Sequence, residues 1–95
     1  MKLLMTLYSG AHPERVRQVL EAHEAQGFTE IDHAHGFGTT GRVEGTRAWP
    51  GETAILISVV PDERVGALET ALRGLATGAV GERLHVAVLP VEHFF

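Results

Sequence analysis

Two histidines separated by one residue are the first candidates for chemistry in this chain. Asp32, His33, Ala34 and His35 follow one another in a segment that we expect to be a β-strand. Alternate strand residues share a face, so both imidazoles would lie together, with Asp32 on the other face unless the strand twists. That spacing suits Cu(II), Ni(II) or Zn(II). We expect either a metal site at His33 and His35 or two half-exposed histidines near a subunit boundary. A third ligand would come from a neighbouring chain or from His85, His93 or His12.

Two glycine-containing segments could offer backbone N–H groups to an anion. One is His35-Gly36-Phe37-Gly38-Thr39-Thr40-Gly41, and the other is Thr77-Gly78-Ala79-Val80-Gly81. Glycine lets the backbone approach a ligand closely, although many strand ends carry such a pattern. We expect the two segments near opposite ends of the sheet edge region, so that they would meet only across a subunit boundary.

The elements that position these residues follow from hydrophobic periodicity and turn residues. Apolar residues at helical spacing predict two helices, and apolar runs between glycine or proline predict four strands. The expected strands cover 2–8, 28–35, 53–60 and 84–91; one helix begins at Pro13 and stops at Gly27, and the other runs from Pro61-Asp62 to Leu75. This order, with right-handed crossovers, predicts a single α+β domain over 1–95. Its fold would be ferredoxin-like (βαββαβ), a four-stranded antiparallel sheet with both helices on one face.

The segment between the second and third expected strands is long. Residues 36–51 contain five of the chain's 11 glycines together with Pro50. A connection of this length exceeds a hairpin turn, so we expect a flexible functional loop over about 36–52.

The third and fourth expected strands are apolar on both faces. Ala54 to Val60 and Val86 to Leu89 show no alternation of polar and apolar residues. Two helices on one face would leave the other uncovered, and monomers rarely expose an apolar area of that size. We expect another copy of the chain to cover it. The alternative, a glycine-rich loop folded back over the sheet, would be poor cover.

Composition excludes several classes of function. The net charge of −4 argues against nucleic acid as a partner, and the absence of cysteine excludes thiol chemistry and disulfides. No segment has the length of a membrane span or signal peptide, so we expect a cytoplasmic protein without membrane insertion. Ser9 and Ser58 have no base implied by spacing, so we do not expect an enzyme.

These segments resemble the PII signalling protein family over most of the chain. Gly36-Phe37-Gly38 before a long loop is similar to the start of that family's T-loop, and Thr77 to Gly81 followed by Leu89-Pro90-Val91 is similar to its B-loop and last strand. The resemblance implies a homotrimer that binds ATP or ADP in clefts between subunits and contacts a membrane transporter or regulatory protein through the loop. It assigns nucleotide binding to Gly36, Phe37, Gly38, Thr39, Thr77, Gly78, Ala79, Val80, Gly81 and Arg83. It assigns partner binding to Arg42, Glu44, Arg47 and Trp49.

The chain departs from the family at several motif positions. Thr39-Thr40 stands where the family usually has Arg-Gln, and Gly81-Glu82-Arg83-Leu84 replaces Gly-Asp-Gly-Lys, which leaves Arg83 in place of the lysine that meets phosphate. We expect no counterpart of the family's C-terminal arginine or of its modifiable loop tyrosine. We therefore expect a PII-like protein rather than an orthodox nitrogen regulator.

A second resemblance is to the CutA divalent-cation tolerance family, also trimers of ferredoxin-like subunits. It is carried by Trp49-Pro50-Gly51-Glu52 and by Ala87 to Glu92. It implies a divalent-metal-binding trimer that uses His33 and His35. A structural trimer without a ligand is the third alternative.

Overall fold

The computed structural model describes residues 1–23, 27–35, 52–75 and 82–95. Its elements follow the predicted order of strand, helix, strand, strand, helix, strand. They are β1 (Lys2–Ser9), α1 (Glu14–Ala22), β2 (Thr29–His35), β3 (Glu52–Val60), α2 (Asp62–Leu75) and β4 (Arg83–Pro90).

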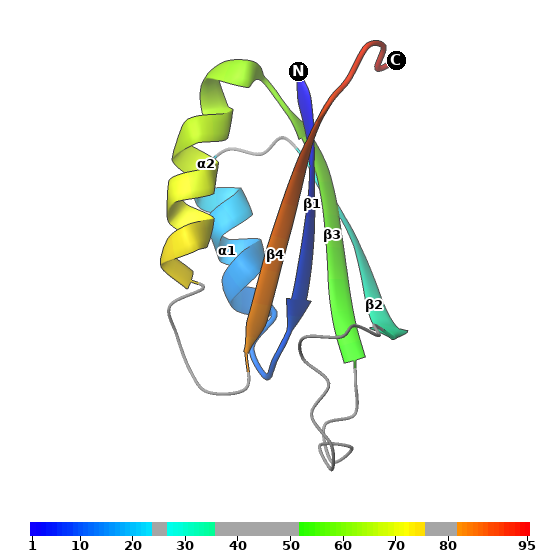
Figure 1. The fold of residues 1–95 in the computed structure, drawn as a ribbon, viewed down its shortest axis with the longest axis vertical. Coiled ribbons are helices and arrows are strands. Elements are labelled where there is room, and N and C mark those ends of the chain that lie inside the picture. Colours follow the sequence, from blue (N-terminus) through cyan, green and yellow to red (C-terminus); the bar gives the residue numbers. More distant parts are fainter. Residues whose placement is uncertain (24–26, 36–51, 76–81) are drawn as a thin grey trace.

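The four strands form one antiparallel sheet in the order β2-β3-β1-β4. In the register of the central strands, Met5 lies opposite Ile57 on β3 and opposite Ala87 on β4. Both helices lie on the same side of this sheet (Figure 1). The predicted ferredoxin-like fold is therefore confirmed, with β2 and β4 as the edge strands.

The ends of the elements differ by a few residues from the expected ones. α1 begins at Glu14, after Pro13, and ends at Ala22 with His23 as its C-terminal cap, whereas we expected the helix to continue to Gly27. β4 begins at Arg83 and ends at Pro90, one residue earlier than expected at each end. Terminal turns have few long-range contacts, so sequence periodicity fixes them poorly.

The core lies between the sheet and the two helices. Val16 and Leu20 of α1 and Leu68 and Leu72 of α2 are almost completely buried, which confirms the predicted apolar stripes. The sheet contributes its even-numbered β1 and β3 positions: Leu4, Tyr8, Ala54, Leu56 and Val60. Burial of each large aliphatic side chain contributes roughly 1.5–3 kcal/mol.

One polar group in this core lacks a partner among the described residues. Thr6 is 1% exposed, and its hydroxyl makes no hydrogen bond within the part of the chain that the structure describes. Ser58, the other buried polar residue of the sheet, is 4% exposed.

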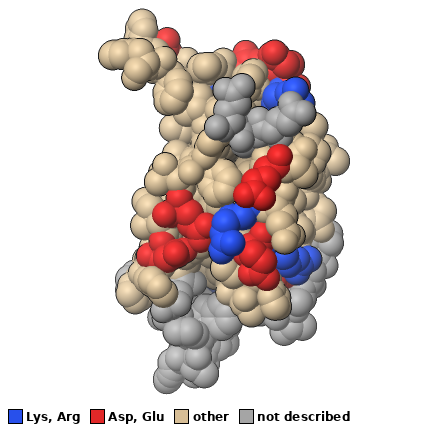
Figure 2. All heavy atoms as spheres, turned by 180° about the vertical axis from the view of Figure 1, so that it is seen from behind, with Lys and Arg blue, Asp and Glu red and all other residues tan. Residues whose placement is uncertain are grey.

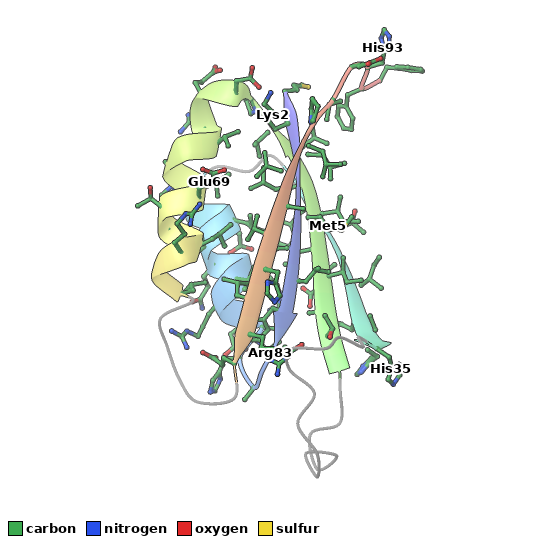
Figure 3. All side chains as sticks on the ribbon, in the orientation of Figure 1. Lys2, Met5, His35, Glu69, Arg83 and His93 are labelled. Carbon is green, nitrogen blue, oxygen red and sulfur yellow. The ribbon has the colours of Figure 1, made fainter. Side chains whose placement is uncertain are left out.

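The opposite face of the sheet carries neither α1 nor α2, and we call it the open face. Its residues alternate with the buried ones, and Met5 projects from it near the middle of β1 (Figure 3). Ile31 and Leu89, on the edge strands, are 46% and 45% exposed. The register places Thr29, His85 and Arg83 on this face as well. The apolar residues of the open face are Leu3, Met5, Leu7, Ile31, Ile55, Ile57, Val59, Ala87 and Leu89. The prediction that the segments Ala54 to Val60 and Val86 to Leu89 place apolar residues on both faces of the sheet is thus confirmed for β3 and for this part of β4.

Neither helix is long and apolar enough to cross a membrane, judged on the described residues.

Candidate functional site

Three of the residues predicted to bind ligands belong to the described structure: His33, His35 and Arg83. The other predicted nucleotide-binding residues (Gly36, Phe37, Gly38, Thr39, Thr77, Gly78, Ala79, Val80 and Gly81) lie outside the described residues. The same holds for the predicted partner-binding residues Arg42, Glu44, Arg47 and Trp49.

The strand ends next to these two segments lie at one end of the sheet. β2 ends at His35 and β4 begins at Arg83, and both residues appear at the same end of the molecule (Figure 3). They belong to opposite edge strands, with β3 and β1 between them. Strands lie about 4.8 Å apart, so roughly 14 Å of sheet separates the two positions within one subunit. We expected the two glycine-containing segments near opposite ends of the sheet edge region, and this is wrong along the strand direction, because both adjoining strand ends lie at the same end of the sheet. The two strand ends are nevertheless on opposite edges, as the expectation of a separation within one subunit requires.

A hydrogen-bonded group stands at this end of the sheet, beside Arg83. The Tyr8 hydroxyl at the end of β1 donates to Glu82 Oε2 at 2.5 Å and accepts from the His12 backbone N–H at 3.1 Å. Arg15 Nη1 of α1 lies 3.5 Å from the same Glu82 oxygen. The Glu82 side chain is 13% exposed. We call this group the Tyr8–Glu82 contact; it joins β1, α1 and the residue before β4.

The environment of Tyr8 favours its neutral form. Burial raises the pKa of the Tyr8 phenol, and the hydrogen bond to Glu82 raises this pKa further. The hydroxyl therefore stays protonated at neutral pH and donates a hydrogen bond to the carboxylate.

Gly10 makes room for the contact. A Cβ at this position would collide with the Tyr8 hydroxyl and would come within 3.0 Å of Glu82 Cγ. Sequence reasoning identified neither Tyr8 nor Glu82 as partners, and the glycine after a strand gave no specific signal for them.

The predicted metal ligands sit at an irregularity of β2. Ile31 pairs with Ile55 and Ala34 with Thr53, so Asp32 and His33 together oppose the single residue Ala54. This β-bulge leaves His33 with φ of 62°, in the left-handed region that non-glycine residues rarely adopt.

The bulge borders an open pocket of about 250 Å³ between β2 and the start of α1. Asp32 and His33 line it together with Arg17 and Gly10. Arg17 Nε donates to Glu30 Oε1 at 2.6 Å, so the guanidinium at this pocket is already paired. His35 does not line the pocket.

The histidines do not gather into a metal centre within the described part of one chain. No group of three or more His, Cys, Asp or Glu residues there could hold a metal ion. His12 Nδ1 lies 3.2 Å from Glu14 Oε2, and His85 pairs in register with Leu7 on β1. His93 lies at the opposite end of the molecule from His35 (Figure 3). The metal site at His33 and His35 stays a prediction that would need ligands from outside this set.

Charge is distributed differently from the apolar residues. Acidic and basic side chains of the described residues lie beside one another on the surface seen from behind (Figure 2). The apolar residues of the open face, in contrast, adjoin one another across all four strands, and Arg83 lies at the end of this face where β4 begins. Among the described residues, the apolar part of the open face is the surface best suited to bury against another protein surface.

Comparisons with known proteins agree with this architecture. No model of a protein family matches the sequence, and no curated protein sequence matches it significantly. Solved structures do: CPII from Thiomonas intermedia K12 bound to ADP, AMP and acetate is 24% identical, with a TM-score of 0.69 over 97% of this chain and 88% of that chain. CPII bound to ADP and bicarbonate is 26% identical, with a TM-score of 0.65 over 93% of this chain and 86% of that one.

A further similar structure comes from Thermus thermophilus and is described as that of a PII-like signalling protein. It is 19% identical, with a TM-score of 0.63 over 93% of this chain and 85% of the other. The apo form of CPII is described as a nitrogen regulatory PII-like protein. The resemblance to PII-like proteins inferred from the sequence is thus confirmed at the level of the fold.

Proposed function

We propose that this chain is a PII-like regulatory protein that binds an adenine nucleotide in clefts between the subunits of a homotrimer. The observation that carries the proposal is the structural likeness to CPII, which spans 97% of this chain and includes forms bound to ADP and AMP. The proposal assigns ligand binding to the chain and no catalytic step, and it places the protein in the cytoplasm.

The open face supports the oligomer. An apolar area of several hundred Å² would contribute on the order of ten kcal/mol to association before entropic costs, at roughly 25 cal/mol per Å². The open face extends across all four strands, from Ile31 on β2 to Leu89 on β4. Packing such faces together would set the edge strand of one copy beside the opposite edge strand of the next.

That arrangement would complete the nucleotide site. The proposed ligand-binding residues flank His35 on one edge strand and Arg83 on the other, roughly 14 Å apart by strand spacing in one subunit. The Arg83 guanidinium would bind a phosphate oxygen, in place of the lysine that the resemblance leads one to expect. The remaining proposed contacts are Gly36, Phe37, Gly38, Thr39, Thr77, Gly78, Ala79, Val80 and Gly81.

The output of the sensor would be the segment 36–52. A nucleotide can change the population of a loop conformation only when it contacts one conformation better than the other. Arg42, Glu44, Arg47 and Trp49 would then be presented to a transporter or another regulatory protein.

Isothermal titration with ADP, AMP and ATP, each with and without bicarbonate, tests the proposal. The variant Arg83→Gln should weaken ADP binding about tenfold, because it loses a charge-assisted hydrogen bond. Arg64→Gln, in the first turn of α2, is the matched control and should bind ADP like the parent chain. Absence of heat with every nucleotide would overturn the proposal. Titration with Zn(II) and Cu(II), repeated on His33→Ala, tests the alternative of a metal-binding trimer.

A further inference from the structure

Glu82 is a carboxylate next to a residue that is proposed to bind phosphate. It precedes Arg83, the cation proposed above to meet phosphate, and an ionised, solvent-facing carboxylate beside that position would repel an anionic ligand. The structure turns the Glu82 side chain away from solvent, to an exposure of 13%, where it meets Tyr8 and Arg15. The Arg15 guanidinium, 3.5 Å away, offsets the negative charge.

The packing of Tyr8 fixes the position and the direction of its hydrogen bond to Glu82. Its ring is 5% exposed in the core, so packing fixes the position of the hydroxyl. The hydroxyl accepts from the His12 N–H at 3.1 Å, which directs its own proton to Glu82 at 2.5 Å. Both hydrogen-bonding roles of the phenol are thus used.

The residue at position 10 serves the same contact. The space that a Cβ would occupy at Gly10 is taken by the Tyr8 hydroxyl and by Glu82 Cγ. A side chain at position 10 would displace the Tyr8 hydroxyl, so the glycine permits the contact between positions 8 and 82.

Glu82 is also where the chain joins the sheet. Arg83 pairs with Ser9 and Leu84 with Tyr8 at the first positions of β4, an edge strand with one neighbour in the sheet. The start of β4 is therefore held by its backbone pairing with β1 and by the side-chain contact between Tyr8 and Glu82.

We infer that the Tyr8–Glu82 contact is a positioning device for the nucleotide site: it fixes the start of β4 and so places Arg83 against the phosphate, while Arg15 neutralises the adjacent carboxylate. Tyr8, Glu82 and Arg15 act through Arg83 and need not touch the ligand. This inference rests on the proposed function, because it assumes that Arg83 binds a nucleotide phosphate.

The chain offers a matched control at the other edge of the sheet. Glu30 on β2 is 16% exposed and accepts from Arg17 Nε at 2.6 Å, so it is a carboxylate with similar burial and a similar basic partner. Removal of Glu30 should disturb the fold about as much as removal of Glu82, without displacing Arg83.

The experiment compares four variants with the parent chain: Tyr8→Phe, Glu82→Ala, Glu82→Gln and Glu30→Ala. Titration with ADP should show binding weakened about tenfold in Tyr8→Phe and Glu82→Ala, as for Arg83→Gln, because displacement of Arg83 loses its charge-assisted hydrogen bond to phosphate. Glu82→Gln keeps an acceptor for the Tyr8 hydroxyl and should bind ADP within about threefold of the parent chain. Glu30→Ala should leave ADP affinity unchanged.

Hydrogen exchange without ligand tests the contact itself. Amides from Arg83 to Val86 should exchange faster in Tyr8→Phe and Glu82→Ala, whereas Glu30→Ala should accelerate exchange in β2. If the parent chain binds ADP and Tyr8→Phe and Glu82→Ala bind it equally well, the positioning role is wrong and the proposed function stands. If the parent chain binds no nucleotide, the proposed function falls and the positioning role with it. Unchanged exchange at the start of β4 would show that the contact does not hold the strand.

Discussion

A single charge placed in the open face should dissociate the oligomer while leaving the subunit folded. Met5 lies at the centre of this face, between Ile57 and Ala87 in the register of the sheet. In the single chain its side chain is only partly buried, so the carboxylate of Met5→Glu would reach water in a free subunit. In an assembly built on the open face the same carboxylate would be enclosed by apolar residues.

The expected penalty follows from the cost of burying that carboxylate. The cheapest way to do so at pH 7 is to protonate it, which costs about 1.36 kcal/mol for each of roughly 2.7 pKa units, or about 3.7 kcal/mol per copy. A trimer would lose about 11 kcal/mol, before the apolar contacts of Met5 are counted. Per copy, the penalty of about 3.7 kcal/mol is a large share of the stabilisation, on the order of ten kcal/mol before entropic costs, that one open face could supply.

Light scattering coupled to size exclusion measures the outcome. The parent chain should give about 31 kDa at micromolar concentration, three times its 10.3 kDa, as a closed C₃ assembly requires. Met5→Glu should give the single-chain mass with an unchanged far-ultraviolet circular dichroism spectrum. Ala67→Glu, on an exposed position of α2, adds the same charge on the helical side and should stay trimeric. A parent chain of 10.3 kDa, or a Met5→Glu variant as large as the parent, would contradict the assignment of the open face as the interface.

Three further predictions concern single residues. Thr6→Val removes a buried hydroxyl that lacks a partner among the described residues and keeps its shape, so it should raise the free energy of unfolding by about 1–2 kcal/mol in urea titration; a loss would show that the hydroxyl is satisfied. His33→Val places a β-branched residue at φ of 62° and should lower that free energy by about 1–3 kcal/mol, whereas His33→Asn should be tolerated; equal stabilities would contradict the bulge geometry. Tyr8 is the only tyrosine, so phenolate absorbance reports its pKa directly: the midpoint should lie above the ordinary value of about 10. Because the pKa of Tyr8 is raised in the folded state, the neutral phenol contributes stability that is fully present below a pH of about 10. This contribution is lost as the pH rises through the folded-state pKa of Tyr8, and Tyr8→Phe should abolish this loss of stability at alkaline pH.

Hydrophobic periodicity predicted the fold because the two helices and β3 each have one dominant hydrophobic pattern. The stripe of Leu68 and Leu72 on α2, and the two-sided apolar run of β3, each allow one placement in a small antiparallel sheet. Local patterns of this kind involve residues close in sequence, and burial then fixes which face they take.

The candidate site could not be predicted in the same way. The hydrogen bond between Tyr8 and Glu82 joins residues separated by 74 positions, and no local pattern indicates it. The bulge at Asp32 and His33 was also missed, because β2 is polar and short and its alternation did not reveal an extra residue. Its consequence is that Asp32 and His33 both oppose Ala54, whereas the simple alternation placed them on opposite faces.

Assembly through the open face would also bring together the two parts of the proposed ligand site, which lie on opposite edges of the sheet in one subunit. Burial of the apolar part of the open face requires a second apolar surface, and the same part of another copy is such a surface. Self-association would bring an edge strand that ends at His35 next to a neighbour's edge strand that begins at Arg83. In the proposed assembly the two strand ends would border one ligand site, to which each of two copies contributes one side. Assembly and ligand binding should therefore be coupled, so that a subunit kept monomeric by Met5→Glu also fails to bind ADP.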